Sequence, residues 1–151
     1  MLEMMKLNDL IKDSDTDIAL PHVDADVRAI CYDSRKAAPG SLFVCVRGVL
    51  ADGHAYARSA YERGCRCFVC ETLPDDLPDD AIVLFSSDTR RSLTMLSAAF
   101  YGHPERRMKL IGITGTKGKT TTAAMLQSIL TAAGFKVGVI GTLGAQIGGE
   151  T

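Results

Sequence analysis

Residues 112–122 constrain this chain more than any other part of its sequence. They read Gly-Ile-Thr-Gly-Thr-Lys-Gly-Lys-Thr-Thr-Thr. The segment before them, 108–114, has the apolar content of a strand, and residues 119–133 have the periodicity of a helix. A glycine loop that joins a strand to the start of a helix is the required context of a phosphate-binding P-loop. The pattern therefore predicts an α/β fold that binds a nucleotide.

The residue types in this loop suit phosphate chemistry. Gly115 and Gly118 allow a tight turn whose backbone N–H groups point at phosphate oxygens, and the start of the following helix adds partial positive charge. Lys119 is predicted to be the catalytic lysine that reaches the β- and γ-phosphates, and the Thr120 hydroxyl to bind Mg²⁺. The predicted ATP-binding residues are Gly115, Thr116, Lys117, Gly118, Lys119, Thr120 and Thr121. The strict pattern requires glycine at position 113, where this chain has Ile113, so the loop is a variant; the alternative is a purely structural connection.

Strand-like and helix-like segments alternate through the rest of the chain. We predict strands at 27–32, 41–47, 66–70, 81–85 and 136–140, and helices at 5–12, 54–63 and 88–101. This alternation is typical of α/β proteins with mostly parallel sheets, and the nearly all-apolar segment 41–47 is predicted to be a central strand. We place a domain boundary that separates residues 1–105 from residues 106–151. The second domain has few strands, and we expect it to be incomplete within these 151 residues.

Charge and hydropathy exclude several classes of function. Lys plus Arg is 17 and Asp plus Glu is 18, which gives a net charge of −1. This balance argues against a nucleic-acid binder with a basic surface. No apolar run approaches the roughly 20 residues that span a bilayer, and the N-terminus does not have the apolar core of a secretory signal. We therefore expect a cytoplasmic protein without a membrane partner.

The five cysteines indicate free thiols, because they are odd in number and the expected compartment is reducing. Strand alternation predicts that Cys65 and Cys67 share one face, opposite to Cys70. No histidine lies near them at the spacing of zinc ligands, so we interpret them as small core residues.

Several ordered motifs resemble the Mur ligase family. Residues 110–123 resemble its ATP loop, in which the same variant first position is normal and asparagine is more usual at the position of Lys117. Upstream, Tyr-Asp-Ser-Arg at 32–35 and Gly-Val-Leu-Ala-Asp-Gly-His at 48–54 resemble its N-terminal domain. Residues 99–104 are similar to the member that adds the third residue of the peptidoglycan stem peptide. The member that adds D-Ala-D-Ala shares two of these motifs and stays an alternative, as does a non-catalytic nucleotide-binding module.

The resemblance implies a fold and a reaction. The fold is an N-terminal UDP-substrate-binding α/β domain at 1–105, followed at 106–151 by the first strand–loop–helix–strand unit of a central ATPase domain. The reaction uses ATP and Mg²⁺ to convert the D-glutamyl carboxylate of UDP-MurNAc-L-Ala-D-Glu to an acyl phosphate, which an amino acid then attacks to form an amide. The resemblance places further metal ligands and the amino-acid pocket beyond residue 151, so we expect residues 1–151 alone to be inactive. Whether diaminopimelate or lysine is added, and the oligomeric state, are left open.

The resemblance also implies where the UDP substrate binds. Carried over by position, the contacting residues are Tyr32, Ser34, Val49, Leu50 and Ala51. From spacing alone, residues 33–35 are favoured to be a capped turn. Asp52 is predicted to be a helix N-cap and His54 a residue at a helix start rather than a catalyst.

Overall fold

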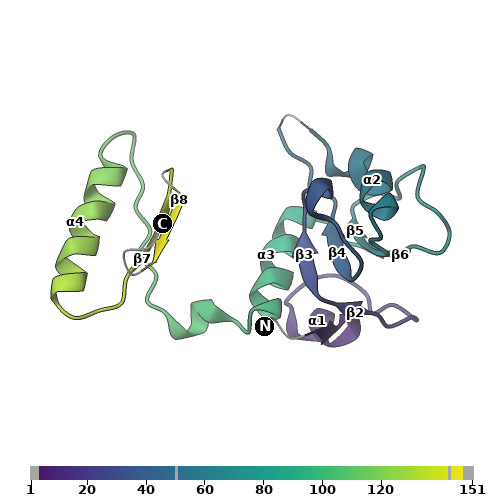
Figure 1. The fold of residues 1–151 in the computed structure, drawn as a ribbon, viewed down its shortest axis with the longest axis horizontal. Helices are drawn as coiled ribbons and strands as arrows, with labels where there is room; N and C mark the ends of the chain where they lie inside the picture. Colours follow the sequence, from purple (N-terminus) through teal and green to yellow (C-terminus); the bar gives the residue numbers. More distant parts are fainter. Residues whose placement is uncertain (1–3, 50, 143, 148–151) are drawn as a thin grey trace. The chain divides into compact units, whose positions relative to one another are not determined.

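The computed structural model describes residues 4–49, 51–142 and 144–147, and the chain divides into two compact units, Met1–Met108 and Lys109–Thr151 (Figure 1). The first unit is built on a four-stranded parallel sheet with the strand order β3-β4-β5-β6. Its strands are β3 (Ala29–Cys31), β4 (Ser41–Val44), β5 (Cys67–Cys70) and β6 (Ile82–Phe85). The α/β prediction and the central position of the 41–47 segment are confirmed, although β4 already ends at Val44.

Helices cover both faces of this sheet. The helices of the unit are α1 (Leu7–Asp13), α2 (Ala57–Glu62) and α3 (Thr89–Phe100), with short 3-10 helices η1 (Ser34–Lys36), η2 (Gly53–Tyr56) and η3 (Pro104–Arg107). The helix predicted at 54–63 therefore forms in two parts, η2 and then α2. A two-residue antiparallel pair, β1 (Met5–Lys6) with β2 (Asp26–Val27), lies beside α1.

The ends of the helices follow local sequence signals. Asp88 caps α3, since its carboxylate accepts the backbone N–H of Arg91. Gly64 follows α2 in a left-handed conformation with φ of +97°, and its N–H donates to the carbonyl of Tyr61. Both of these predicted helix ends are confirmed.

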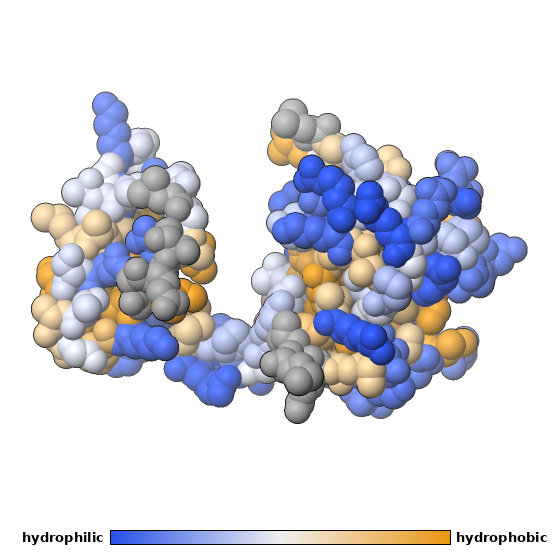
Figure 2. Space-filling model, in the orientation of Figure 1, coloured by the Kyte–Doolittle hydropathy of each residue, from blue (hydrophilic) through white to orange (hydrophobic). Residues whose placement is uncertain are grey.

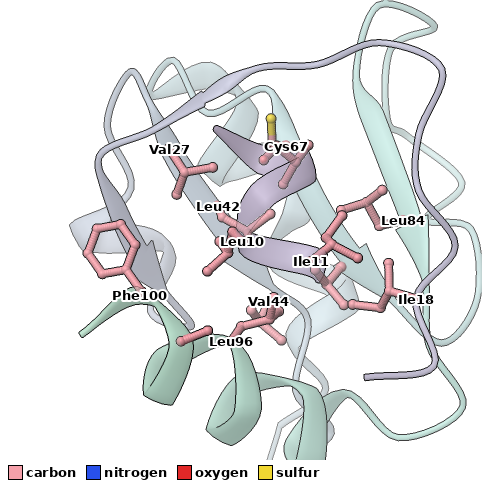
Figure 3. Close-up of a cluster of buried hydrophobic side chains, with 13 residues drawn as sticks. Leu10, Ile11, Ile18, Val27, Leu42, Val44, Cys67, Leu84, Leu96 and Phe100 are labelled. Carbon is pink, nitrogen blue, oxygen red and sulfur yellow. The ribbon is translucent and has the colours of Figure 1, made fainter. Parts of the chain in front are cut away.

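Two hydrophobic clusters lie on opposite faces of the sheet. The larger cluster joins one face of β4 and β5 to α1 and α3, and Figure 3 shows Leu10, Leu42, Val44 and Leu96 converging in it. The other cluster lies under α2 and contains Phe43 and Phe68, whose rings meet edge to face at 6.1 Å, among others. Burial of each large apolar side chain contributes about 1.5–3 kcal/mol, so these clusters hold the sheet between its helices.

The cysteines divide between the two clusters differently from the prediction. Cys67 belongs to the larger cluster, whereas Cys65 lies with Cys70 in the cluster under α2. The prediction that Cys65 and Cys67 share a face is wrong because β5 begins only at Cys67. The Cys65 N–H donates to the carbonyl of Ala60 at the end of α2, so strand alternation does not extend to it. All five thiols are free and buried, and the described ranges contain no group of three or more metal-ligating side chains.

The second unit contains one helix, α4 (Lys119–Ala132), and an antiparallel hairpin of β7 (Gly138–Gly141) and β8 (Gly144–Ile147) among its described residues. The strand predicted at 136–140 forms two residues later, and β8 falls in a glycine-rich stretch that carried no strand signal. The strand predicted at 108–114 is absent from the described structure. A strand needs a hydrogen-bonded neighbour, and none of the residues described here pairs with this segment.

Apolar side chains stay accessible in the second unit. Helix α4 buries none of its residues, and Met125 and Ile129 are both 63% exposed. Figure 2 shows hydrophobic residues over the surface of this unit. In the part of the chain that the structure describes, no helix has both the length and the apolar character needed to cross a bilayer.

A carboxylate ties the long N-terminal loop to the end of the sheet. Asp17 accepts the Ser86 hydroxyl through Oδ1 and the Ser87 backbone N–H through Oδ2, both at 2.7 Å. Hydrogen bonds from Ser87, and then from Ser86, lower the pKa of Asp17 to about 2. These bonds are stronger to the ionised carboxylate than to the neutral acid, so ionisation of Asp17 stabilises the folded chain.

Replacing Asp17 should therefore destabilise the fold in a pH-dependent way. Asp17→Ala is expected to lower the free energy of unfolding by about 1 kcal/mol at neutral pH, the typical contribution of one or two such bonds. Because folding lowers this pKa, the stabilisation is complete above the unfolded value of 3.8 and is lost as the pH falls to about 2. Urea unfolding of the wild type and of Asp17→Ala, each carried out from neutral to acidic pH, measures the difference in their free energies of unfolding.

Asp15→Ala is the matched control, because the Asp15 side chain is 91% exposed and its only ion pair within the described chain is a 3.5 Å contact to Arg91. An Asp17→Ala variant whose unfolding curves coincide with those of the wild type at neutral pH contradicts the prediction.

Candidate functional site

The predicted substrate residues lie at the edge of the sheet where the parallel strands end. Tyr32 and Ser34 follow β3, and the loop at 47–53 follows β4, its neighbour in the sheet. In open α/β sheets this carboxyl edge is where ligands bind, because loops from adjacent strands meet there. The strand order thus brings two predicted contact segments to one edge of the sheet.

The turn around Ser34 is closed by its two charged neighbours. Asp33 accepts the backbone N–H of Arg35, and the two side chains form an ion pair with Nη2 2.7 Å from Oδ2. Hydrogen bonds from Arg35 lower the pKa of Asp33 to about 2. The capped turn predicted from spacing is confirmed. Asp33 and Arg35 are occupied with each other, while Tyr32 is 66% exposed and Ser34 is half-buried.

The loop after β4 folds back tightly on the end of that strand. Arg47 and Asp52 form an isolated antiparallel bridge, and the Gly48 N–H donates to the Ala51 carbonyl at 2.8 Å. Gly53 approaches the strand so closely that a Cβ would lie 2.7 Å from the Val46 nitrogen, which only glycine permits. Of the predicted contacts on this loop, Val49 is fully exposed, Ala51 is exposed, and Leu50 lies outside the described residues.

His54 connects this loop to the end of the next strand. Its Nδ1 lies 2.6 Å from Asp52 Oδ1, and its Nε2 accepts the Glu71 backbone N–H at 2.9 Å. Asp52 caps η2 by accepting the His54 backbone N–H, as predicted, and this bond followed by the ring contact lowers the pKa of Asp52. The His54 side chain is only 9% exposed. As well as lying at the helix start, as predicted, it links Asp52 to the backbone of Glu71.

Sequence reasoning missed the other members of this cluster. Arg47 Nε lies 3.3 Å from Asp52 Oδ2 and 3.4 Å from Glu71 Oε2, and Arg90 donates to the Arg47 carbonyl at 2.9 Å. Thr89, at the start of α3, lies 3.0 Å from Glu71 Oε1. The available signal was positional, because Arg47 and Glu71 are the first charged residues after the two fully buried strands β4 and β5.

The glycine loop of the second unit is folded around its lysine. Gly115 and Gly118 have φ of +149° and +79°, and Lys119, the first residue of α4, donates from Nζ to the Gly115 carbonyl. The Thr122 N–H donates to the Gly118 carbonyl, whereas the first N–H groups of a helix have no partner within it and point out of its N-terminus. Thr116, Lys117, Thr120 and Thr121 are exposed here. The seven predicted ATP-binding residues therefore surround one helix N-terminus, an arrangement that fits an anionic phosphate chain.

Two family profiles match the chain, one on each side of residue 108. The profile described as Mur ligase family, catalytic domain, matches residues 26–105, and that of the Mur ligase middle domain matches residues 113–151. The first match alone covers more than half of the chain.

Curated relatives and solved structures agree with these profiles. The chain is 45% identical to the UDP-N-acetylmuramoyl-L-alanyl-D-glutamate–2,6-diaminopimelate ligases of Clostridium botulinum over 127 residues and of Bacillus licheniformis over 128 residues. These alignments cover 83% and 85% of this chain but 26% of each relative, so the chain spans about a quarter of their length. A crystal structure of MurF from Acinetobacter baumannii superimposes with a TM-score of 0.63 at 30% identity, covering 87% of this chain and 28% of that one.

Proposed function

The chain belongs to the Mur ligase family, and we propose that it supplies the UDP-substrate domain and the ATP loop of a ligase that adds 2,6-diaminopimelate to UDP-MurNAc-L-Ala-D-Glu. The observation that carries the proposal is that both family profiles match in order, each over a unit with a site of the appropriate chemistry. Residues 1–105 are assigned to substrate binding and residues 106–151 to the start of the ATP-binding domain.

Sequence identity favours diaminopimelate over D-Ala-D-Ala as the group that is added. The diaminopimelate ligases of two bacteria share 45% of their aligned residues with this chain, whereas the MurF structure shares 30%. We also favour diaminopimelate over lysine as the amino acid that is added, because both relatives are named as diaminopimelate ligases.

At the sheet edge, we assign the UDP group to Tyr32, Ser34, Val49, Leu50 and Ala51. The exposed Tyr32 ring offers an apolar surface for a base, and the Ser34 hydroxyl makes no hydrogen bond with any other described residue. The backbone of the fully exposed Val49 supplies further polar groups. An apolar surface beside a few polar groups suits a nucleotide.

At the glycine loop, ATP is assigned to residues 115–121, with Lys119 as the catalytic lysine. Lys119 would transfer its hydrogen bond from the Gly115 carbonyl to the phosphates and stabilise the charge that develops as the phosphoryl group passes to the D-glutamyl carboxylate. Thr120 is the second residue of α4, and its hydroxyl would hold Mg²⁺, which supplies further charge neutralisation when bound.

The substrate assignment predicts a loss of UDP affinity when the Ser34 hydroxyl is removed. Ser34→Ala should weaken UDP binding by about 1 kcal/mol, the contribution of one hydrogen bond, without changing the melting temperature. Calorimetric titration of residues 1–151 with UDP measures this. Ser59→Ala, on α2, is the control and should bind as the wild type does; equal affinity in Ser34→Ala removes Ser34 from the site.

The ATP-loop assignment predicts unequal roles for two lysines. In a chimera where residues 1–151 replace the matching part of the Clostridium botulinum ligase, Lys119→Ala should lower the rate by about 100-fold or more, since one preorganised electrostatic donor is lost. Lys117→Asn should keep most of the activity, because asparagine is the family's usual residue there. ADP release and amide formation, measured together, report both variants.

The unmodified chimera tests whether residues 1–151 supply a working UDP-substrate domain and ATP loop, and it should consume ATP and add diaminopimelate to UDP-MurNAc-L-Ala-D-Glu. A folded but inactive chimera contradicts the proposal. A dead Lys117→Asn variant beside an active Lys119→Ala variant shows that the phosphate-binding lysine is misassigned.

A further inference from the structure

We infer that Asp52, His54 and Glu71 are positioning residues that hold the loop at 47–53 in the shape that binds the UDP group. His54 does this as a neutral imidazole that donates through Nδ1 and accepts through Nε2. This inference rests on the proposed function, because it concerns the same substrate loop. None of the three residues is among the five that are assigned to contact the UDP group.

The hydrogen bonds of the His54 ring determine where its proton lies. The Glu71 backbone N–H can only donate, so Nε2, at 2.9 Å, must accept and carries no hydrogen. Nδ1 then carries the proton and donates to Asp52 Oδ1 at 2.6 Å. Both ring nitrogens are thus used to join the loop after β4 to the residue after β5.

Glu71 extends this connection to a third element. Its Oε1 accepts the backbone N–H of Thr89 at 3.3 Å, and Thr89 Oγ1 donates to the Cys45 carbonyl at 3.0 Å. Thr89 is fully buried at the start of α3. The loop is therefore connected to the ends of two central strands and to the start of one helix.

The charges of the cluster indicate positioning rather than ligand binding. Arg47 contacts the carboxylates of both Asp52 and Glu71, and the Arg90 side chain donates to the Arg47 carbonyl. The charged groups of the cluster are thus engaged with one another. The His54 side chain is 9% exposed whereas Val49 is fully exposed, so a ligand would meet the loop and not the ring.

The test measures UDP affinity of residues 1–151 by calorimetry for the wild type and three variants. His54→Leu, which removes both bonds, should weaken binding by about tenfold. His54→Gln places an amide oxygen where Nε2 accepts and should retain most of the affinity. His22→Leu, in an exposed loop, is the matched control and should bind as the wild type does.

Rescue by His54→Gln separates positioning from simple loss of structure. Thermal unfolding of each variant reports whether it is folded. A folded His54→Leu variant that has lost affinity, beside a His54→Gln variant that retains it, identifies the hydrogen bond from the Glu71 N–H as the feature that UDP binding needs.

Each result decides a separate question. A wild type that does not bind UDP overturns the proposed function and this inference with it. A wild type that binds UDP, beside a folded His54→Leu variant of equal affinity, overturns this inference alone. Should His54→Leu fail to fold, His54→Gln decides: a folded His54→Gln variant that has lost most of its UDP affinity overturns the positioning role.

Discussion

Burial of β4 and β5 on both faces is the constraint on which the rest of the first unit depends. All eight residues of these strands are buried, so each face of the sheet must be covered by helices. The chain supplies α1 and α3 for one face and α2 for the other, and every strand of the sheet runs in the same direction. Parallel strands bring their carboxyl ends to one edge, where the loops with the candidate substrate residues lie.

The polar groups at this edge bond to one another, whereas the core beneath them consists of packed apolar side chains. Just beyond the buried strands, Arg47, Asp52, His54 and Glu71 satisfy one another and tie the exposed loop to the sheet. Arg47 and Asp52 are 52% and 47% exposed, whereas the His54 ring is 9% exposed, so the hydrogen bonds of the ring are the ones that burial makes costly to break. The loop held in this way keeps the exposed Val49 at the sheet edge, while the Gly48 N–H and the Ala51 carbonyl bond to each other.

The two candidate sites depend on their surroundings to different degrees. The glycine loop takes its shape from local features: the left-handed Gly118, the start of α4 and the Lys119 contact to Gly115. It keeps this shape although residues 108–114 form no strand. The sheet-edge site instead combines residues from after β3, β4 and β5, so it exists only when the sheet is assembled.

The sequence alone determined the features that depend on residues close together in the chain. The α/β class, the central strand, the Asp88 cap, the Gly64 helix end and the capped turn at 33–35 all follow from patterns a few residues long. Tertiary structure decided what requires distant partners. Residues 108–114 are apolar enough for a strand yet have no described neighbour, and Cys65 bonds to α2 instead of continuing β5. The bridge from His54 to Glu71 spans 17 residues and forms only because β4 and β5 are adjacent, which no local pattern specifies.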